Sequence, residues 1–344
     1  VWDYKKMSDD PNLEGQYPIG KETLIFPKLL KTKGYSNGMV GKWGLGPPNS
    51  SSIPTEMGFD YFYGYNCQRM AHNLYPPHLW ENNNRDILDN EVISPKLKLQ
   101  SGQDPYNEDN YKIFNQKDYA PDKMHIKAQD FIEKNKDNPF FLYYASPIPH
   151  APLQAPEYLI EKYRKIIGNE EPYLGNVGYF PTRYPRATYA AMIEYIDIQV
   201  GEIVQQLKDN GIYENTIIML TSDNGPTYAG GVDFKYFNST GIFQNDPKRM
   251  KGYTYEGGVR VPFIVSWPNK IKSKRVIDDI SISYDIFPTI TQLSGVNDSN
   301  TYPTDGISLY NIFTNKNSSL ERDYIYWEFP SYGGQLAARM GDYK

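Results

Sequence analysis

The sequence predicts an α/β fold in which helices cover both faces of a mostly parallel sheet. Apolar runs of strand length alternate along the chain with stretches whose apolar residues recur every three or four positions. In addition, the run at 140–145 is apolar throughout, as expected for a strand that is covered on both faces. Strands that alternate with helices favour parallel pairing, because the helices serve as crossovers.

Four segments have the apolar periodicity of helices. They are residues 23–33, 122–136, 189–208 and 283–293. Gly34, Gly211 and Gly295 lie just past three of these segments, where helices commonly end. Pro27 and Pro288 are tolerated only in a first turn, so we expect both of their helices to begin close to the proline.

Four apolar runs have the length of strands. They are residues 35–40, 140–145, 217–220 and 261–267. Residues 47–122 are rich in Asn, Pro, Tyr and Asp, which predicts long surface loops with small local elements. Residues 337–344 have the pattern of a strand and a turn that has just begun, with nothing after it in the chain to pair with.

The composition excludes several classes of protein. The 344 residues include 36 Lys and Arg against 41 Asp and Glu, and the net charge of −5 argues against a dedicated nucleic-acid binder. No apolar run approaches the roughly 20 residues that a membrane span needs. The single cysteine, Cys67, excludes an intrachain disulfide and a cysteine-based zinc site. The 31 tyrosines and 5 tryptophans suit stacking against sugar or aryl rings.

Polar residues gather next to the predicted strands, and in an open parallel sheet ligands bind beyond the carboxyl ends of the strands. Four such segments occur: 41–44, 147–152, 223–224, and Lys251 together with 256–260. Asp223 and Asn224 offer the oxygen ligands that Ca²⁺ or Mg²⁺ prefers. The same residues, followed by Gly225, are also an ordinary turn signal.

His150 and two lysines have two interpretations each. His150 either caps a rigid proline-rich loop or donates a proton to a leaving group. Lys42 and Lys251 are by default solvated surface lysines. If all three converge on a metal ion, they form a clamp for a tetrahedral oxyanion.

Taken in chain order, these segments resemble the type I, formylglycine-dependent sulfatases of the alkaline phosphatase superfamily. The resemblance runs from Thr23 to Lys344. The segments that carry it are LLKTKGY (29–35), GKWGLG (41–46), GFDYFYG (58–64), PHAPLQ (149–154), TSDNGP (221–226), KG (251–252), YEGGVRVP (255–262) and DGISL (305–309).

The resemblance implies a role for each matching residue. Asp223 and Asn224 match the downstream pair of calcium ligands, so it implies bound Ca²⁺, with Mg²⁺ as the alternative. Lys42 and Lys251 match the lysines that hold the sulfate group. His150 matches the histidine near the ester oxygen and is the candidate general acid.

Arg69, His72 and His78 resemble the substrate-loop residues of carbohydrate sulfatases, although by default His72 would be a loop-packing residue. The chain departs from the family at Gly44, two positions after Lys42, where many sulfatases have a histidine. One hypothesis is that His72 supplies the role of that histidine.

A larger departure concerns the nucleophile. The family matures a Cys or Ser to formylglycine within a Cys/Ser-x-Pro-x-Arg motif, and the residues after Cys67 do not match it. We expect this motif, the formylglycine and the two remaining metal-binding aspartates in a segment upstream of this chain. Residues 1–325 are then expected to form a partial sulfatase domain without its nucleophile strand, and residues 326–344 the start of a truncated C-terminal subdomain.

The resemblance implies a sulfuric ester hydrolase that acts on a sulfated sugar, with galactose- or N-acetylgalactosamine-sulfate favoured. It also implies a formylglycine-generating maturase as partner and a periplasmic or secreted location. One alternative is a phosphodiesterase or phosphonate hydrolase of the same superfamily. However, the four histidines form no Asp-x-His or His-x-x-x-His pattern, which favours one hard ion over two transition metals. The other alternative is a non-catalytic relic that binds sulfated sugars.

Overall fold

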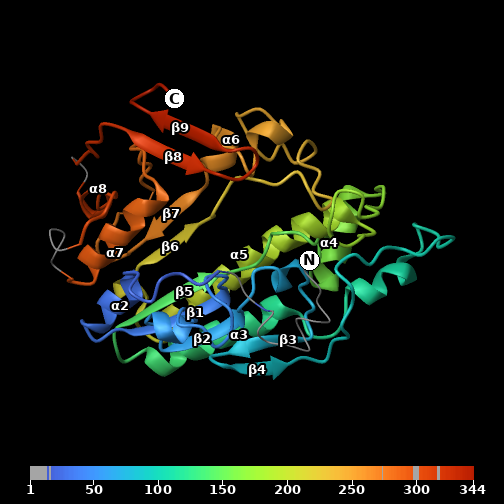
Figure 1. Cartoon of the computed structure of the whole chain (residues 1–344), viewed down its shortest axis with the longest axis horizontal. Helices are drawn as coiled ribbons and strands as arrows, with labels where there is room; N and C mark the ends of the chain where they lie inside the picture. Colours follow the sequence, from blue (N-terminus) through green and yellow to red (C-terminus); the bar gives the residue numbers. More distant parts are fainter. Residues whose placement is uncertain (1–13, 15–16, 273, 297–301, 316–317) are drawn as a thin grey trace. The chain divides into compact units, whose positions relative to one another are not determined.

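The computed structural model describes residue 14 and residues 17–272, 274–296, 302–315 and 318–344 (Figure 1). The chain divides into two compact units. Unit 1 contains the residues up to Gln206 together with Ala229–Val232, and unit 2 contains Leu207–Tyr228 together with Asp233–Lys344. The boundary expected at 325/326 differs from this division and stays a prediction. In the part of the chain that the structure describes, no helix is long and apolar enough to cross a membrane.

The sheet of unit 1 has five strands in the order β4-β3-β2-β1-β5. The central strand β1 (Ser36–Lys42) pairs in parallel with β2 (Tyr61–Tyr65) and β5 (Phe140–Ala145). By contrast, β3 (His78–Glu81) and β4 (Asn84–Ile87) pair antiparallel. The sheet is therefore mixed, which corrects the mostly parallel prediction. Because only two residues separate β3 from β4, antiparallel pairing is the one arrangement open to them.

Residues 47–122, expected to be surface loops, contain three of the five strands of this sheet. The aromatic residues Phe62, Tyr63 and Tyr65, which looked like loop composition, are almost fully buried in β2. Gly64 lies so close to β1 that a Cβ atom there would sit 1.9 Å from the Gly41 carbonyl oxygen. The prediction failed because short aromatic strands that contain glycine lack a clear apolar period.

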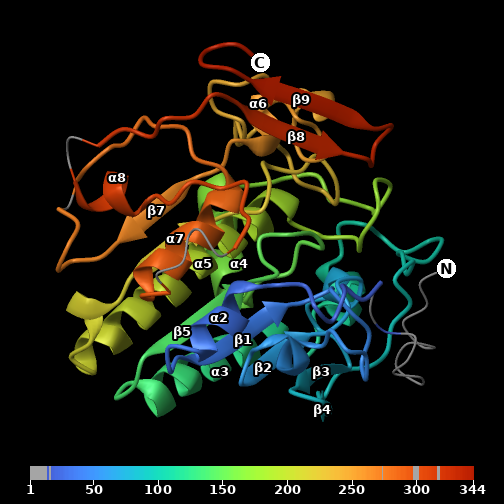
Figure 2. The ribbon, with the colours of Figure 1, turned by 60° about the vertical axis from the view of Figure 1, so that its left-hand side comes forward.

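Four helices belong wholly or largely to unit 1. They are α2 (Phe26–Lys31), α3 (Ala120–Asn135), α4 (Glu157–Ile167) and α5 (Pro185–Asp209). The Asn37 side chain donates to the Pro27 carbonyl of α2 at 2.9 Å. A Cβ atom on the next residue, Gly38, would instead meet the Phe131 ring of α3 at 2.7 Å. Because consecutive strand residues point to opposite faces, α2 and α3 cover the two faces of this sheet (Figure 2).

Strand β5 lies at the side of the sheet and is only partly buried. Its residues are half-buried, apart from Tyr143, which is 46% exposed. Among the described strands, β5 pairs only with β1 and forms the edge of the sheet. Leu142 and Tyr144 nevertheless pack against one apolar core and Phe141 and Ala145 against another, so both faces of the strand are covered as predicted.

Unit 2 contains two antiparallel strand pairs. β6 (Ile218–Thr221) pairs with β7 (Phe263–Ser266), and β8 (Ile325–Phe329) pairs with β9 (Gln335–Arg339). The final strand was expected to have nothing after it in the chain to pair with, and its partner β8 precedes it. The helices of this unit are α6 (Glu256–Val259), α7 (Ile286–Leu293) and α8 (Tyr310–Thr314). Its apolar core centres on Leu309, Ile312 and Phe313.

Short 3₁₀ helices connect the main elements. They are η2 (Pro54–Met57), η3 (Met70–His72), η4 (Glu108–Phe114), η5 (Tyr213–Asn215), η6 (Pro247–Arg249) and η7 (Ser283–Asp285). As expected from their prolines, α2 has Pro27 in its first turn and α7 begins two residues before Pro288. The predicted segment 23–33 was too long, because only its middle is helical.

Candidate active site

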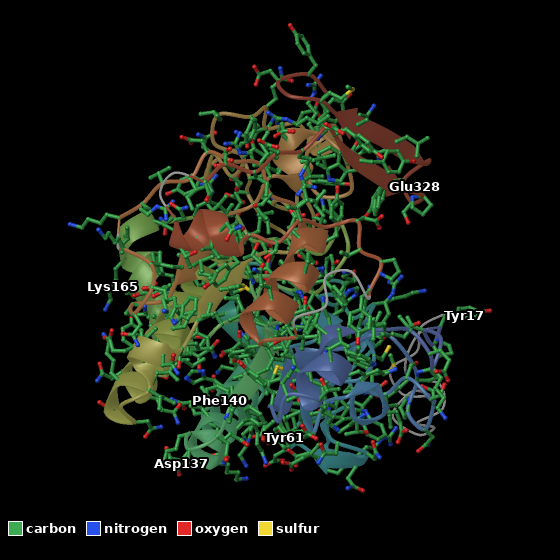
Figure 3. All side chains as sticks on the ribbon, turned by 90° about the vertical axis from the view of Figure 1, so that its left-hand side faces the viewer. Tyr17, Tyr61, Asp137, Phe140, Lys165 and Glu328 are labelled. Atoms are coloured by element: carbon green, nitrogen blue, oxygen red, sulfur yellow. The ribbon has the colours of Figure 1, made fainter. Side chains whose placement is uncertain are left out.

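The carboxyl ends of β1, β2 and β5 lie at one edge of the sheet of unit 1. In the register of these strands, Lys42 is opposite Tyr65 and Gly41 is opposite Ala145. Figure 3 labels Tyr61 and Phe140, the first residues of β2 and β5, which belong to the other edge. Lys42 therefore ends the central strand at the edge where the loops after β2 and β5 also begin, as the ligand-binding rule for such sheets predicts.

Backbone contacts fix the chain on both sides of Lys42. Gly41 has a φ of 119°, and a Cβ atom there would lie 2.0 Å from the Ala145 carbonyl oxygen, so only glycine fits. After Lys42, the Trp43 N–H donates to Tyr65 and the Gly44 N–H donates to Asn66, both at 3.0 Å. The position of Lys42 is thus set by backbone on either side.

Two of the predicted site residues, His72 and His150, stack on each other. Their ring centroids are 5.3 Å apart and their planes differ by 14°. Tyr179 stands across both rings, with centroid distances of 5.1 Å to His72 and 5.6 Å to His150. We call these three residues the ring cluster. His72 reaches it from η3, which follows β2, and His150 reaches it from the loop after β5.

The hydrogen bond of His150 assigns its two ring nitrogens. Nδ1 lies 2.6 Å from the Ala151 carbonyl oxygen. A carbonyl oxygen can only accept, so Nδ1 carries a hydrogen and donates it. Nε2 is then the atom that gains or gives up a proton, which is the arrangement that a general acid needs.

The other two predicted substrate residues lie outside the ring cluster. Arg69 is exposed and directly precedes η3. His78 is 3% exposed in β3, and its Nε2 lies 2.6 Å from Glu14. Glu14 also accepts hydrogen bonds from Trp80 at 2.8 Å and Arg85 at 3.0 Å. Because His78 is buried against the buried Glu14 carboxylate, the structure does not support a substrate contact for His78.

In unit 2 the remaining predicted residues come together. Asp223 and Asn224 follow β6, and the Gly225 N–H donates to the Gly258 carbonyl at 2.9 Å. The Lys251 N–H donates to the Pro226 carbonyl at 3.0 Å. These two hydrogen bonds join the loop after β6, the segment around Lys251 and α6 in one place.

The surroundings of Lys251 shift its pKa. Burial lowers the pKa of the Lys251 ammonium below its usual range, and the neighbouring Asp223 carboxylate opposes part of this shift. A partly desolvated ammonium attracts an anion more strongly than a fully hydrated one does. Lys251 is therefore electrostatically suited to hold a sulfate oxygen.

A sequence profile of the family described as Sulfatase matches residues 7–296 of the chain. The chain belongs to the sulfatase family. This sulfatase is 31% identical over 281 residues to "Arylsulfatase J" of Mus musculus, an alignment that covers 80% of this chain and 39% of the relative. It is 28% identical over 295 residues to "N-acetylgalactosamine-6-sulfatase" of Canis lupus familiaris, with 85% of this chain and 48% of the relative covered.

A solved structure is also similar to this sulfatase. "Ps i-CgsB in complex with k-i-k-neocarrahexaose" superposes with a TM-score of 0.72 and 26% identity, covering 96% of this chain and 66% of that one. The chain spans about half of the length of the curated relatives, or less.

The sulfatase family typically uses a metal ion and formylglycine. Asp223 and Asn224 are of the chemical type that binds calcium, because both side chains carry oxygen atoms. The Asp223 carboxylate is exposed, and the Asn224 amide nitrogen donates to the Gly225 carbonyl at 2.9 Å. By themselves these two residues are an incomplete set of ligands. Nowhere in the described ranges do three or more His, Cys, Asp or Glu residues group as metal ligands, whereas Ca²⁺ takes 6–8 oxygens. Asp223 and Asn224 are therefore suited to be part of a calcium site.

Sequence reasoning missed Tyr179 as a member of the site. The turn residues Gly175 and Gly178 precede it, and such glycines predict a tight turn but not what the turn contacts. The contact with His72 and His150 is made across long sequence separations, which no local signal encodes.

Proposed function

We propose that this sulfatase hydrolyses sulfate monoesters on a sulfated sugar, with galactose- or N-acetylgalactosamine-sulfate units favoured. The observation that carries the proposal is the hydrogen bond from the Lys251 N–H to the Pro226 carbonyl, which joins Lys251 to the loop of Asp223 and Asn224 in a chain of this family. The sugar class is supported by two similar proteins, one named for N-acetylgalactosamine-6-sulfate and one solved with neocarrahexaose.

In this proposal the residues of the chain have distinct tasks. Lys42 and Lys251 bind the sulfate oxygens and neutralise the charge that shifts during transfer. His150, held by Ala151 through Nδ1, protonates the departing sugar oxygen from Nε2. His72, stacked on His150, limits the orientations that the acid adopts.

We further propose that the nucleophile is a formylglycine that a maturase generates in a longer form of the protein, which is exported. The 344 residues contain no Cys/Ser-x-Pro-x-Arg motif. When bound, Ca²⁺ would supply a positive charge against the sulfate oxygens, and Asp223 and Asn224 would be two of its ligands.

The rival superfamily activities have less support. A phosphonate monoester hydrolase superposes with a TM-score of 0.54 at 19% identity, which shows a shared fold alone. Two of the histidines pair with carboxylates, His78 with Glu14 and His125 with Glu202. That leaves few imidazole ligands for the two transition metals that such enzymes use.

The test is a substrate screen on the full-length protein coexpressed with a maturase. Defined sulfated galactose and N-acetylgalactosamine sugars are compared with phosphodiesters and phosphonate monoesters. We expect sulfate release, with Lys251→Met reducing kcat by at least about 100-fold. The matched control is Lys248→Met, an exposed lysine three residues earlier. Turnover of phosphodiesters without any sulfate release would refute the proposal, and sugar binding without turnover would favour the relic.

A further inference from the structure

Tyr179 is the feature of this site that neither the family motifs nor the proposed mechanism uses. Its ring stands at 63° to His72 and at 77° to His150, so it contacts both stacked imidazoles from the side. The three rings come from η3, from the loop after β5 and from the segment 173–182. Each pair is within stacking or edge-to-face range, so the orientation of every ring depends on the other two.

The backbone of Tyr179 is in an unfavourable conformation. Its φ is 63°, in the left-handed region that residues with a Cβ atom rarely adopt. Such a conformation persists only where the surroundings impose it, and it is found disproportionately at functional sites. The Lys98 ammonium donates to the Tyr179 carbonyl oxygen and so holds this peptide group.

Backbone hydrogen bonds join the two ends of the loop that contains Tyr179. Tyr173 and Thr182 exchange two backbone hydrogen bonds, at 2.9 and 2.8 Å. Inside the loop, the Val177 N–H donates to the Tyr173 hydroxyl at 2.9 Å. The loop is therefore a rigid support for Tyr179 rather than an open surface turn.

Gly230 packs against both Tyr179 and Ala151. A Cβ atom there would lie 2.4 Å from the Ala151 Cβ and 2.9 Å from the Tyr179 ring. Ala151 is the residue whose carbonyl accepts the His150 Nδ1 hydrogen bond. Gly230 therefore packs against both Tyr179 and Ala151, the residue that accepts the His150 hydrogen bond.

We infer that Tyr179 is a positioning residue for the His72–His150 pair. Its ring, held by its left-handed backbone, Lys98 and Gly230, fixes the angle at which His150 presents Nε2. A catalytic effect of Tyr179 rests on the proposed function, because Tyr179 would act through His150, the proposed general acid. The geometric part stands on the ring contacts alone.

The first test reads the histidine rings directly. In full-length protein with ¹³C-labelled histidine, the ring C–H resonances of His72 and His150 are assigned with His72→Gln and His150→Gln. We expect Tyr179→Leu to shift both resonances because the aromatic ring current is lost. Tyr179→Phe should leave them near their wild-type positions. Unchanged resonances in Tyr179→Leu would overturn the inference.

The second test separates positioning from substrate contact. We expect Tyr179→Leu to lower kcat by about 10- to 100-fold with KM within about 2-fold, since small misplacements of a catalytic group cost this much. Tyr179→Phe should restore kcat to within about 2-fold. An increase in KM alone would overturn the inference, because it would make Tyr179 a substrate contact.

A second variant covers the case in which Tyr179→Leu does not fold. Lys98→Met removes the donor to the Tyr179 carbonyl, and the exposed Lys96→Met is its matched control. We expect the first but not the second to shift the two histidine resonances, and shifts in neither would overturn the inference. If the wild type hydrolyses no sulfate ester while the resonances still shift as expected, the proposed function fails and the positioning of the rings stands.

Discussion

Gly41→Ala is the substitution whose consequence follows most directly from the structure. Gly41 lies in β1, paired with Gly64 on one side and Ala145 on the other, and directly precedes Lys42. An added Cβ atom would sit 2.0 Å from the Ala145 carbonyl oxygen. To reach ordinary contact at 3.4 Å, β1 and β5 would have to separate locally by about 1.4 Å.

That separation exceeds what the adjoining hydrogen bonds between the strands tolerate. A buried peptide group left without its partner costs about 1–3 kcal/mol. The left-handed φ of 119° adds about 1–2 kcal/mol once a Cβ atom is present. The expected loss in the free energy of unfolding is about 2–5 kcal/mol, a large share of the 5–15 kcal/mol of a typical domain.

Gly34→Ala is the matched control. Gly34 also has a positive φ, 77°, and lies just before β1, but a Cβ atom there would meet nothing within 4 Å. It should therefore cost about 1–2 kcal/mol, from the backbone term alone. Urea denaturation of the two variants measures the difference. Equal shifts of the two midpoints would refute the reasoning, because they would show that the close approach of β1 to β5 contributes nothing.

Two further predictions concern charged groups. The pKa of Lys251 is lowered in the folded state, so its partly buried charge lowers the free energy of unfolding at neutral pH. This loss becomes smaller as the pH rises toward the ordinary lysine pKa of about 10.4, because Lys251 then loses its proton more readily in the folded state than in the unfolded state. Lys251→Met should therefore raise the midpoint of thermal unfolding at pH 7 and remove the gain in stability between pH 7 and pH 10. Lys248→Met should do neither. Thermal melts of both variants at pH 7 and pH 10 test this prediction. Glu14→Gln places an amide next to three donors, two of them buried, and should lower stability by about 2–4 kcal/mol with KM for the sulfated sugar unchanged. A raised KM would instead support a substrate role for His78.

Long amphipathic helices were the elements that sequence patterns located best. The segments 122–136 and 189–208 correspond to α3 and α5, because many periodic apolar residues average out local ambiguity. The strand prediction at 140–145 also matches β5. By contrast, β2, β3 and β4 were missed, since strands of four or five residues with mixed aromatic and polar side chains carry too little periodicity.

Among the candidate site residues, those close together in the chain were the easier to place. Asp223 and Asn224 follow β6 after one residue, and a ligand site near this strand end stays a prediction. Lys251 joins them through backbone hydrogen bonds that no spacing rule foretells. Nothing in the sequence was a reason to treat His78 differently from His72. In the structure, however, His78 is buried next to the Glu14 carboxylate, 64 residues earlier in the chain.

The order of the motifs and the chemical types of their side chains were readable from the chain alone, because each motif is a local pattern. From these came the family, the helices and the expected sulfate chemistry. Folding was needed to stack His72 on His150 under Tyr179, to bury His78 against Glu14 and to pair β3 and β4 antiparallel. These features are contacts whose energy depends on neighbours brought together in space, and a periodicity that spans only a few residues carries no information about them.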